Sequence, residues 1–325
     1  MIRPIRLVAL GTLTVAFASP LHADTAPPFL LRWGSHGSAP GQFFLPTGVG
    51  VDAEGNVYVG DQNNGRVQKF TATGEFLLTW GSTGPANGQF RTPLGVAVDV
   101  FGNVFVADTD NNRIEKFTQS GIFLTAWGSQ GFLNGQFGRP WSVATDAAGN
   151  VYVADALNNR IQKFTGGGLF IRSWSSLGPA RGSFYNPTGV AVGSGGKVYV
   201  ADTFNNRIAV FTGDGTFLST WGAFGTGPGQ FFDPGFLAVD LAGRVHVVDS
   251  YNHRIQVFTE AGAFLYQWGS HGLGDGQFQY PSGIAVNPSG DVYVADPGSD
   301  TVQKFGMGLT AGQSTTWGAL KALYH

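Results

Sequence analysis

The sequence contains no cysteine, and this absence removes several kinds of protein from consideration. Without cysteine the chain can form no disulfide framework, no thiolate metal site, no cysteine nucleophile and no lipid anchor on cysteine. The short apolar segments between residues 29 and 305 also lack the 3.6-residue spacing of helices. Packing alone must therefore stabilise the fold, and a 14% content of aromatic residues supplies bulky side chains for it.

The chain that follows the N-terminal segment also has no excess of basic over acidic residues. Arg3 and Arg6 precede an apolar run at residues 7–18, and small residues follow, as in a secretory signal peptide. Twelve apolar residues are too few to span a membrane, which takes roughly 20. We expect cleavage after Ala23, or after Ala18, and export of the remaining chain. That chain carries 17 basic and 21 acidic residues, so a nucleic-acid partner is not expected.

The rest of the sequence is built on a 47-residue repeat. The repeat is marked by aspartates at Asp61, Asp108, Asp155, Asp202, Asp249 and Asp296, and by tryptophans at Trp33, Trp80, Trp127, Trp174, Trp221 and Trp268. Each repeat contains four short β-branched or aromatic segments that are separated by turn residues. We predict an all-β fold, a six-bladed β-propeller of four-stranded antiparallel blades.

Two columns of the repeat predict left-handed turn residues. One contains only glycine, beginning at Gly55, and lies between the first and second segments. The other precedes the third segment and contains Gly65, Asn112, Asn159, Asn206, His253 and Asp300. Glycine, Asn, Asp and His are the residues that tolerate positive φ.

The two ends of the repeat region predict how the ring closes. Residues 29–33 match residues 76–80 but have no segments of their own before them, while the repeat ends in register at Phe305. We therefore expect the N-terminal segment to supply the outer strand of the sixth blade, which removes a free sheet edge. The predicted organisation is a signal peptide at 1–23, a propeller at 24–305 and a tail at 306–325. If the N-terminal segment does not close the ring, the tail around Trp317 is the alternative outer strand.

Over residues 29–305 the repeat resembles a known family, and the motif recurs six times. Residues 151–164 (VYVADALNNRIQKF) and 87–93 (NGQFRTP) look like the NHL-repeat family of β-propellers, here in an exported, bacterial-type member. The resemblance implies a scaffold and not one function. Some members bind RNA or proteins, some are extracellular sensor or adhesion domains, and related six-bladed propellers are lyases or lactonases. Such lyases use channel histidines and such lactonases use acidic channel ligands, and this sequence matches neither set.

Side chains that recur in every repeat are interpreted as structural. The repeated aspartates are expected to bond either the arginines five positions later or the turn between the strands. The tryptophans and the phenylalanines of the Gly-Gln-Phe loops are expected to pack in the core and between blades. Lys69, Lys116, Lys163 and Lys304 are expected to protect outer edges and solubility. His36 and His271 occupy equivalent loop positions, but no third ligand accompanies them. No metal, cofactor or catalytic residue is therefore predicted.

Departures from the repeat predict the ligand site. Repeat three places Trp141, and repeat five Phe236, where the innermost strand begins at the channel mouth. The predicted site consists of these two anchors with Arg139, Tyr185, Phe232, Asp233 and Tyr280. Rings with a few polar groups suit a protein, a peptide, a small molecule or a carbohydrate, although the rings could instead only cap the channel. We predict a monomeric binding module, with a metal-assisted lyase or lactone hydrolase at the channel mouth as the alternative.

Overall fold

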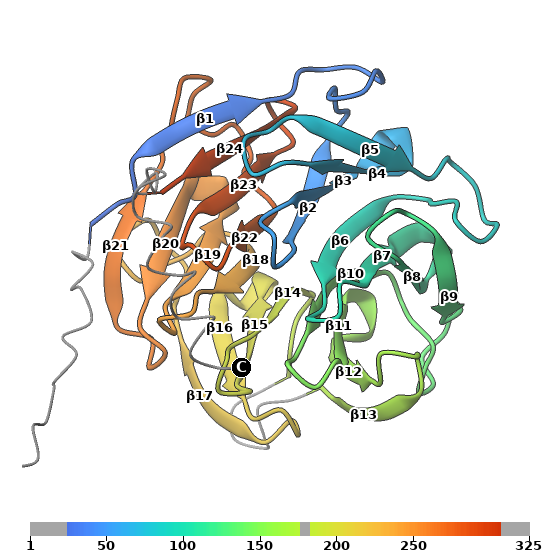
Figure 1. Ribbon diagram of the computed structural model, residues 1–325. Coiled ribbons are helices and arrows are strands. Elements are labelled where there is room, and N and C mark those ends of the chain that lie inside the picture. Colours follow the sequence, from blue (N-terminus) through green and yellow to red (C-terminus); the bar gives the residue numbers. More distant parts are fainter. Residues whose placement is uncertain (1–24, 176–182, 307–325) are drawn as a thin grey trace, which may run out of the picture.

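Residues 25–175 and 183–306 are described by a computed structural model, and they form six four-stranded antiparallel sheets arranged in a ring (Figure 1). The predicted signal peptide and the predicted tail, with Trp317, lie outside the described residues. In five sheets the four strands follow one another in chain order from the centre of the ring to its outside, and in the sixth the outermost strand is the N-terminal one. The prediction of a six-bladed propeller is confirmed.

The first three blades occupy residues 46–174. Blade one contains β2 (Pro46–Val51), β3 (Val57–Asp61), β4 (Arg66–Phe70) and β5 (Phe76–Trp80). Blade two contains β6 (Pro93–Val98), β7 (Val104–Asp108), β8 (Arg113–Phe117) and β9 (Phe123–Trp127). Blade three contains β10 (Pro140–Thr145), β11 (Val151–Asp155), β12 (Arg160–Phe164) and β13 (Phe170–Trp174).

The other three blades complete the ring. Blade four contains β14 (Pro187–Val192), β15 (Val198–Asp202), β16 (Arg207–Phe211) and β17 (Phe217–Trp221). Blade five contains β18 (Pro234–Val239), β19 (Val245–Asp249), β20 (Arg254–Phe258) and β21 (Phe264–Trp268). Blade six contains β22 (Ile284–Val286), β23 (Val292–Asp296), β24 (Thr301–Phe305) and the N-terminal β1 (Phe29–Trp33).

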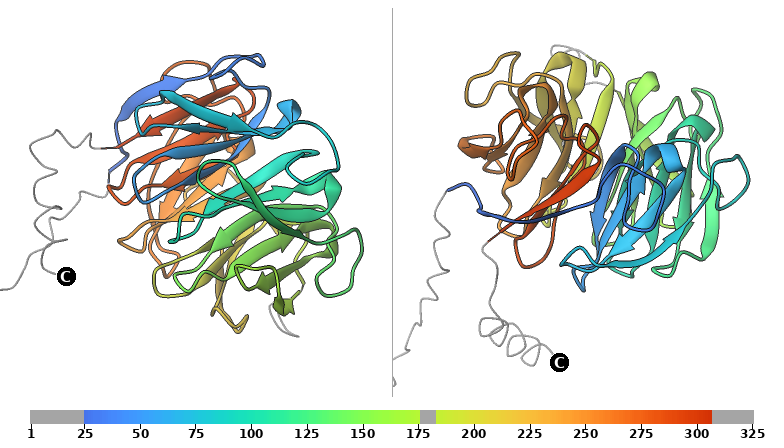
Figure 2. Two further views of the ribbon diagram at one scale, coloured as in Figure 1. Left: turned by 45° about the vertical axis from the view of Figure 1, so that its right-hand side comes forward. Right: turned by 90° about the horizontal axis from the view of Figure 1, so that it is seen from above.

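The N-terminal strand closes the ring as predicted. β1 pairs antiparallel with β24, so that Leu31 lies opposite Lys304 and Trp33 opposite Val302. Figure 1 and both views of Figure 2 show this blue strand lying along the red sixth blade. The pairing covers the edge of β24 that would otherwise be exposed to solvent.

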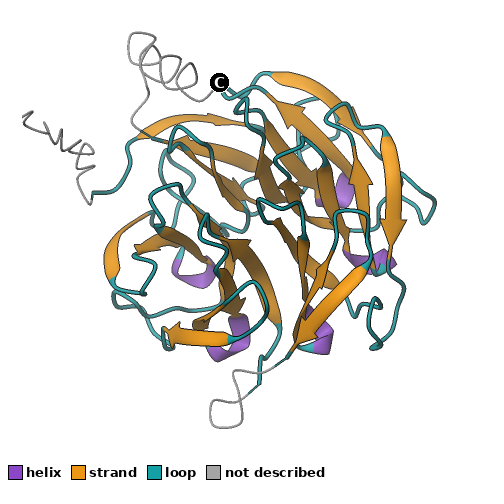
Figure 3. Cartoon of the chain, turned by 60° about the horizontal axis from the view of Figure 1, so that its bottom comes forward, coloured by secondary structure: helices purple, strands orange, loops and turns teal. Residues whose placement is uncertain are grey.

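Short helical turns join the second and third strands of the first five blades. These 3-10 turns are η1 (Gln62–Asn64), η2 (Thr109–Asn111), η3 (Ala156–Asn158), η4 (Thr203–Asn205) and η5 (Ser250–Asn252), drawn in purple in Figure 3. The residue after each has a positive φ, between 52° and 60°, and so has Asp300 in blade six, which confirms the predicted left-handed column. In the described part of the chain, no helix has the length and apolar character that crossing a membrane requires.

The predicted aspartate–arginine bonds are present in five blades. In blade three the Arg160 Nε lies 2.7 Å from Asp155 Oδ2, and the same guanidinium donates to the carbonyl oxygens of Phe132, Leu133 and Gln136. Each arginine therefore ties a blade to the loop that enters it. In blade six, where Thr301 replaces arginine, Asp296 accepts instead from the Ser299 hydroxyl.

Hydrophobic clusters fill all six seams between neighbouring blades. The loop phenylalanines lie in these seams and are almost fully buried: Phe43, Phe90, Phe137, Phe184, Phe231 and Phe278. Each tryptophan from Trp33 to Trp221 packs against a turn glycine of the next blade, as Trp80 does against Gly121, whose φ is 78°. An added Cβ at Gly121 would lie 2.8 Å from the Trp80 ring, so both the conformation and the contact require glycine.

The lysine column does not protect outer edges, and that prediction is wrong. Lys69 and Lys304 are each only 8% exposed. Lys304 Nζ lies 2.9 Å from Asp291 Oδ2, and Lys69 Nζ lies 4.9 Å from the centre of the Tyr58 ring. The Lys116 ammonium donates to the carbonyl oxygen of Gly166 in the next blade. These lysines therefore lie in the seams, where they pair with turn carboxylates, aromatic rings and carbonyl oxygens.

Candidate functional site

One face of the ring is formed by the long loops before the innermost strands and by the 3-10 turns; we call it the loop face. A cavity of about 660 Å³ opens at its centre, at one mouth of the channel that the innermost strands surround. Aromatic residues line much of it: Trp141, Phe204, Phe236, Tyr251 and Tyr280. The polar lining includes Arg139, Asp233, Asn186 and Gln62. Cavities of this size and mixed character are typical of small-ligand sites.

The two predicted anchors both line this cavity, but they differ in burial. Phe236 is only 7% exposed and belongs to the hydrophobic cluster between blades five and six. Trp141 is half-buried and, although it comes from blade three, it packs against the same cluster. Its ring therefore reaches across the channel. Together the two rings form an apolar floor, while the residues around them remain open to solvent.

The structure brings five of the seven predicted site residues together. Arg139, Trp141, Asp233, Phe236 and Tyr280 line the cavity. The other two predicted residues lie behind the lining and not in it. Tyr185 makes an edge contact with Phe204, at 5.1 Å between ring centres, and Phe232 stacks on Tyr251 at 4.8 Å.

Two lining residues were missed from the sequence, Phe204 and Tyr251. They occupy the middle of the 3-10 turns in blades four and five, where other blades have Asn63, Asp110, Leu157 and Gly298. The change to an aromatic residue in only two of six copies is the same kind of signal that identified Trp141. The same signal is present in the turn column of the sequence.

A ring of six equivalent residues surrounds the mouth, each just before the first residue of an innermost strand or its equivalent. This mouth ring consists of Leu45, Thr92, Arg139, Asn186, Asp233 and Tyr280, and all six line the cavity. The first five have φ between 51° and 63°. Glycine is the least strained residue in this conformation, and a β-branched or bulky residue such as Thr92 or Leu45 is strained there.

The two charged members of the mouth ring have different surroundings. Arg139 lies 3.0 Å from Asp110 Oδ1, and its guanidinium lies 5.8 Å from the centre of the Trp141 ring. Asp233 has no ion pair or side-chain hydrogen bond among the residues that the structure describes. Burial and the nearby charge of Asp249 raise the pKa of the Asp233 carboxyl above its ordinary value.

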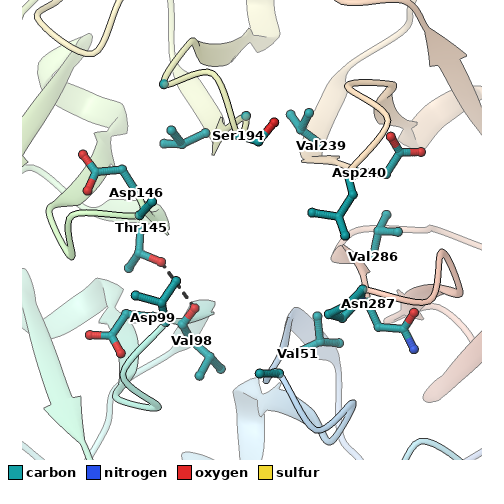
Figure 4. Close-up of a pocket in the computed structure, with 18 of the residues that line it drawn as sticks. Val51, Val98, Asp99, Thr145, Asp146, Ser194, Val239, Asp240, Val286 and Asn287 are labelled. Atoms are coloured by element: carbon teal, nitrogen blue, oxygen red, sulfur yellow. Dashed lines mark hydrogen bonds between the residues drawn. The ribbon is translucent and has the colours of Figure 1, made fainter. Parts of the chain in front are cut away.

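A second cavity, also of about 660 Å³, opens at the opposite mouth of the channel. In Figure 4 the carboxylates of Asp99, Asp146 and Asp240 point away from the centre of this opening. They bond their own turns: Asp99 accepts from the backbone and side chain of Asn103. Burial raises the pKa of Asp240, but hydrogen bonds from His246 and Arg244 outweigh it and lower that pKa to about 2. These acids are therefore committed to turn structure.

The loop histidines belong to different seams. His36 Nδ1 lies 2.9 Å from Asp300 Oδ2, whereas the ring of His271 lies 4.5 Å from that of His253. Within residues 25–175 and 183–306, no group of three or more His, Asp or Glu side chains is placed to hold a metal ion.

Six sheets of four antiparallel strands around a channel define a six-bladed β-propeller. The chain belongs to the NHL repeat family, whose repeat matches residues 45–70, 90–117, 137–164, 184–211, 231–258 and 278–305. No curated protein matches the sequence.

Solved structures of similar fold include proteins with different activities. One is a protein of unknown function from Bacteroides thetaiotaomicron VPI-5482 (TM-score 0.65, 16% identity, 87% of this chain and 74% of that chain). Another is a gluconolactonase from Xanthomonas campestris (TM-score 0.61, 14% identity, 87% and 96%). A third is virginiamycin B lyase from Staphylococcus aureus (TM-score 0.56, 15% identity, 88% and 96%). At these identities the similarity concerns the fold alone.

Proposed function

We propose that this protein is an exported, monomeric binding module that recognises a protein, peptide or small ligand through the cavity of the loop face. The observation that carries the proposal is the convergence there of rings from blades three to six on a few polar side chains. Tyr251 and Tyr280 are each 44% exposed, so their rings remain available for contact. Exposed rings around a concave, sparsely polar surface suit ligand recognition.

The strain of the mouth ring supports the same location. A left-handed backbone costs about 1–2 kcal/mol for a residue with a side chain, relative to glycine. Five non-glycine residues nevertheless adopt the left-handed conformation at equivalent positions around one opening. Strained residues cluster at functional sites because the side chains they present are needed there.

A metal-assisted lyase or lactone hydrolase is the second candidate, since a gluconolactonase and a virginiamycin B lyase share the fold. The Staphylococcus aureus lyase is catalytically inactive as a histidine-to-alanine variant. No histidine lines either cavity in the part of this chain that the structure describes. The turn carboxylates at the opposite mouth already have partners, so the binding module is favoured.

The experiment is a screen of peptides, glycans and small molecules against the purified protein, followed by variants of the cavity. Trp141→Ala and Phe236→Leu are expected to weaken binding of the ligand found, and Leu retains most of the buried volume of Phe236. Phe132→Ala is the matched control, because Phe132 is an exposed ring on a loop of the same face and outside the cavity. Unchanged affinity in both cavity variants would contradict the proposal. Elemental analysis and lactonase and lyase assays test the alternative.

A further inference from the structure

We propose that Asp233, Tyr251 and Tyr280 form a site for an organic cation, an alkylammonium or guanidinium group, within the cavity of the loop face. The inference rests on the proposed function and names the chemical class of its ligand. It is carried by three features: a carboxylate without a partner, a corner of two exposed rings, and the distribution of charge around the mouth.

The carboxylate of Asp233 differs from those of the repeated aspartates that end the second strands. Asp249, close by, has its Oδ2 at 2.7 Å from the Nε of Arg254. Asp233 is held through its backbone instead, since its amide N donates to Asn206 Oδ1 at 3.1 Å. Its side chain has no bond to any described residue, although it is partly buried. A partly buried charge without a partner is costly, and a cationic ligand would compensate it.

The two tyrosines form a corner beside this carboxylate. The rings of Tyr251 and Tyr280 meet edge to face, with centres 5.0 Å apart and planes at 76°. Phe232 stacks on Tyr251 with an interplanar angle of 22° and so holds that ring in place. Both rings line the cavity and each tyrosine is 44% exposed, so aromatic surface is accessible there to a cation, which aromatic rings attract.

The hydroxyl of Tyr280 remains neutral where a cation would bind. A hydrogen bond with Tyr251, partial burial and electrostatic repulsion from the neighbouring Tyr251 and Asp233 groups raise the pKa of the Tyr280 hydroxyl to about 12. Asp233 lines the same cavity as the two tyrosines, so a cation bound there can contact both the carboxylate and the rings.

The charge around the mouth favours a cation over an anion. Arg139 and Asp233 are the charged residues among those described in the cavity lining. The guanidinium of Arg139, on the blade-three side, is already compensated by Asp110 at 3.0 Å. The carboxylate of Asp233, on the blade-five side, is not. The mouth therefore presents one uncompensated negative charge, next to the two tyrosines.

The test is calorimetric titration of the protein with choline and with 3,3-dimethylbutan-1-ol, which has the same shape but no charge. Choline is expected to bind, and the neutral alcohol to bind roughly tenfold more weakly or not at all, since cation–aromatic and charge pairing account for the difference. A titration with the peptide acetyl-Gly-Lys-Gly-amide distinguishes a side-chain cation from a free quaternary ammonium compound. Tighter binding of the peptide assigns the site to protein ligands.

Asp233→Asn is the decisive variant, because it removes the charge and preserves the shape. It is expected to fold, since Asn186 occupies the equivalent mouth-ring position at φ 51°. It should weaken choline binding roughly tenfold or more, while Asp275→Asn, an exposed carboxylate on the same face outside the cavity, should leave it unchanged. Melting curves of both variants verify folding.

Three outcomes would overturn the inference: equal binding of choline and the neutral alcohol, wild-type affinity in Asp233→Asn, or no binding of any of these cations. Its failure is distinguishable from failure of the proposed function. If these cations do not bind but Trp141→Ala weakens the binding of another ligand from the screen, the binding module stands and the cation site is wrong. If no ligand depends on the cavity residues, both are wrong.

Discussion

Glu115 offers a test of how burial of charge limits the stability of this propeller. It lies in β8, is fully buried, and occupies a column where other blades have Gln68, Gln162, Gln256 and Gln303. Its carboxylate accepts from Arg113 Nη2 at 3.0 Å and from the Gly88 amide. Burial nevertheless dominates and raises the pKa of Glu115 from 4.5 to about 7. We expect Glu115→Gln, which restores the repeat, to stabilise the protein at alkaline pH.

The magnitude follows from the two pKa values. Because the folded-state pKa is raised, the contribution of Glu115 is favourable below about pH 4.5 and is lost as the pH rises through about 7. The difference between 4.5 and about 7 corresponds to roughly 3 kcal/mol. A glutamine avoids this loss, as Gln68 shows by donating to the Gln42 carbonyl oxygen at 2.7 Å and accepting from the Gly41 amide at 2.9 Å.

The assay is the free energy of unfolding of both proteins in denaturant at pH 4.5 and pH 8. The stabilisation by Glu115→Gln should approach about 3 kcal/mol at pH 8 and be small at pH 4.5. Gln162→Glu is the reciprocal control, because Gln162 makes in blade three the same two hydrogen bonds that Gln68 makes in blade one. This substitution should destabilise the protein at pH 8 and not at pH 4.5. If Glu115→Gln changes the free energy of unfolding by the same amount at pH 4.5 and at pH 8, the reasoning is refuted.

Two further predictions concern the closure of the ring and its arginines. Deleting residues 24–34 removes β1 and exposes the edge of β24, so the melting temperature should fall by many degrees or the protein should aggregate; an unchanged melting curve would show that β1 does not close the ring. Arg160→Ala leaves the fully buried Asp155 with its hydrogen bonds from Gly138, Asn158 and Gln162 but without its cationic partner, and should cost about 3–5 kcal/mol of unfolding free energy in denaturant titrations. A loss below 1 kcal/mol, the range of exposed pairs, would contradict a buried role for this arginine.

The fold was predictable because the sequence contains the same pattern of strand and turn residues six times. The left-handed residues before each third strand, the glycine turns and the pairing of β1 with β24 all follow from columns of the sequence. The lysine column was misjudged for a physical reason. A strand near the outside of its own sheet is still covered by the turn between the third and fourth strands of the next blade, where the Lys116 ammonium donates to the Gly166 carbonyl oxygen. The residue pattern within one repeat does not predict which residues contact the neighbouring repeat.

The candidate site was predictable in part, because function is expected where repeats differ. Arg139, Trp141, Asp233, Phe236 and Tyr280 were found in this way. Tyr251 and Phe204 were not, since a variable turn column on the surface is ordinary in any sequence. Only the ring geometry brings the turns of blades four and five to the same opening as the innermost strands of blades three and five.

A comparison of two left-handed columns explains why the mouth ring carries information about the ligand. Before the third strands, every residue is Gly, Asn, His or Asp, which are the residues that accept positive φ most readily. The mouth ring requires nearly the same backbone, yet it contains Leu45, Thr92 and Arg139 besides Asn186 and Asp233. If the backbone alone determined the choice, both columns would contain the same residues. The proposed binding site accounts for the extra strain: if these side chains contact the ligand, their variety around one opening suits an asymmetric ligand in a nearly sixfold ring.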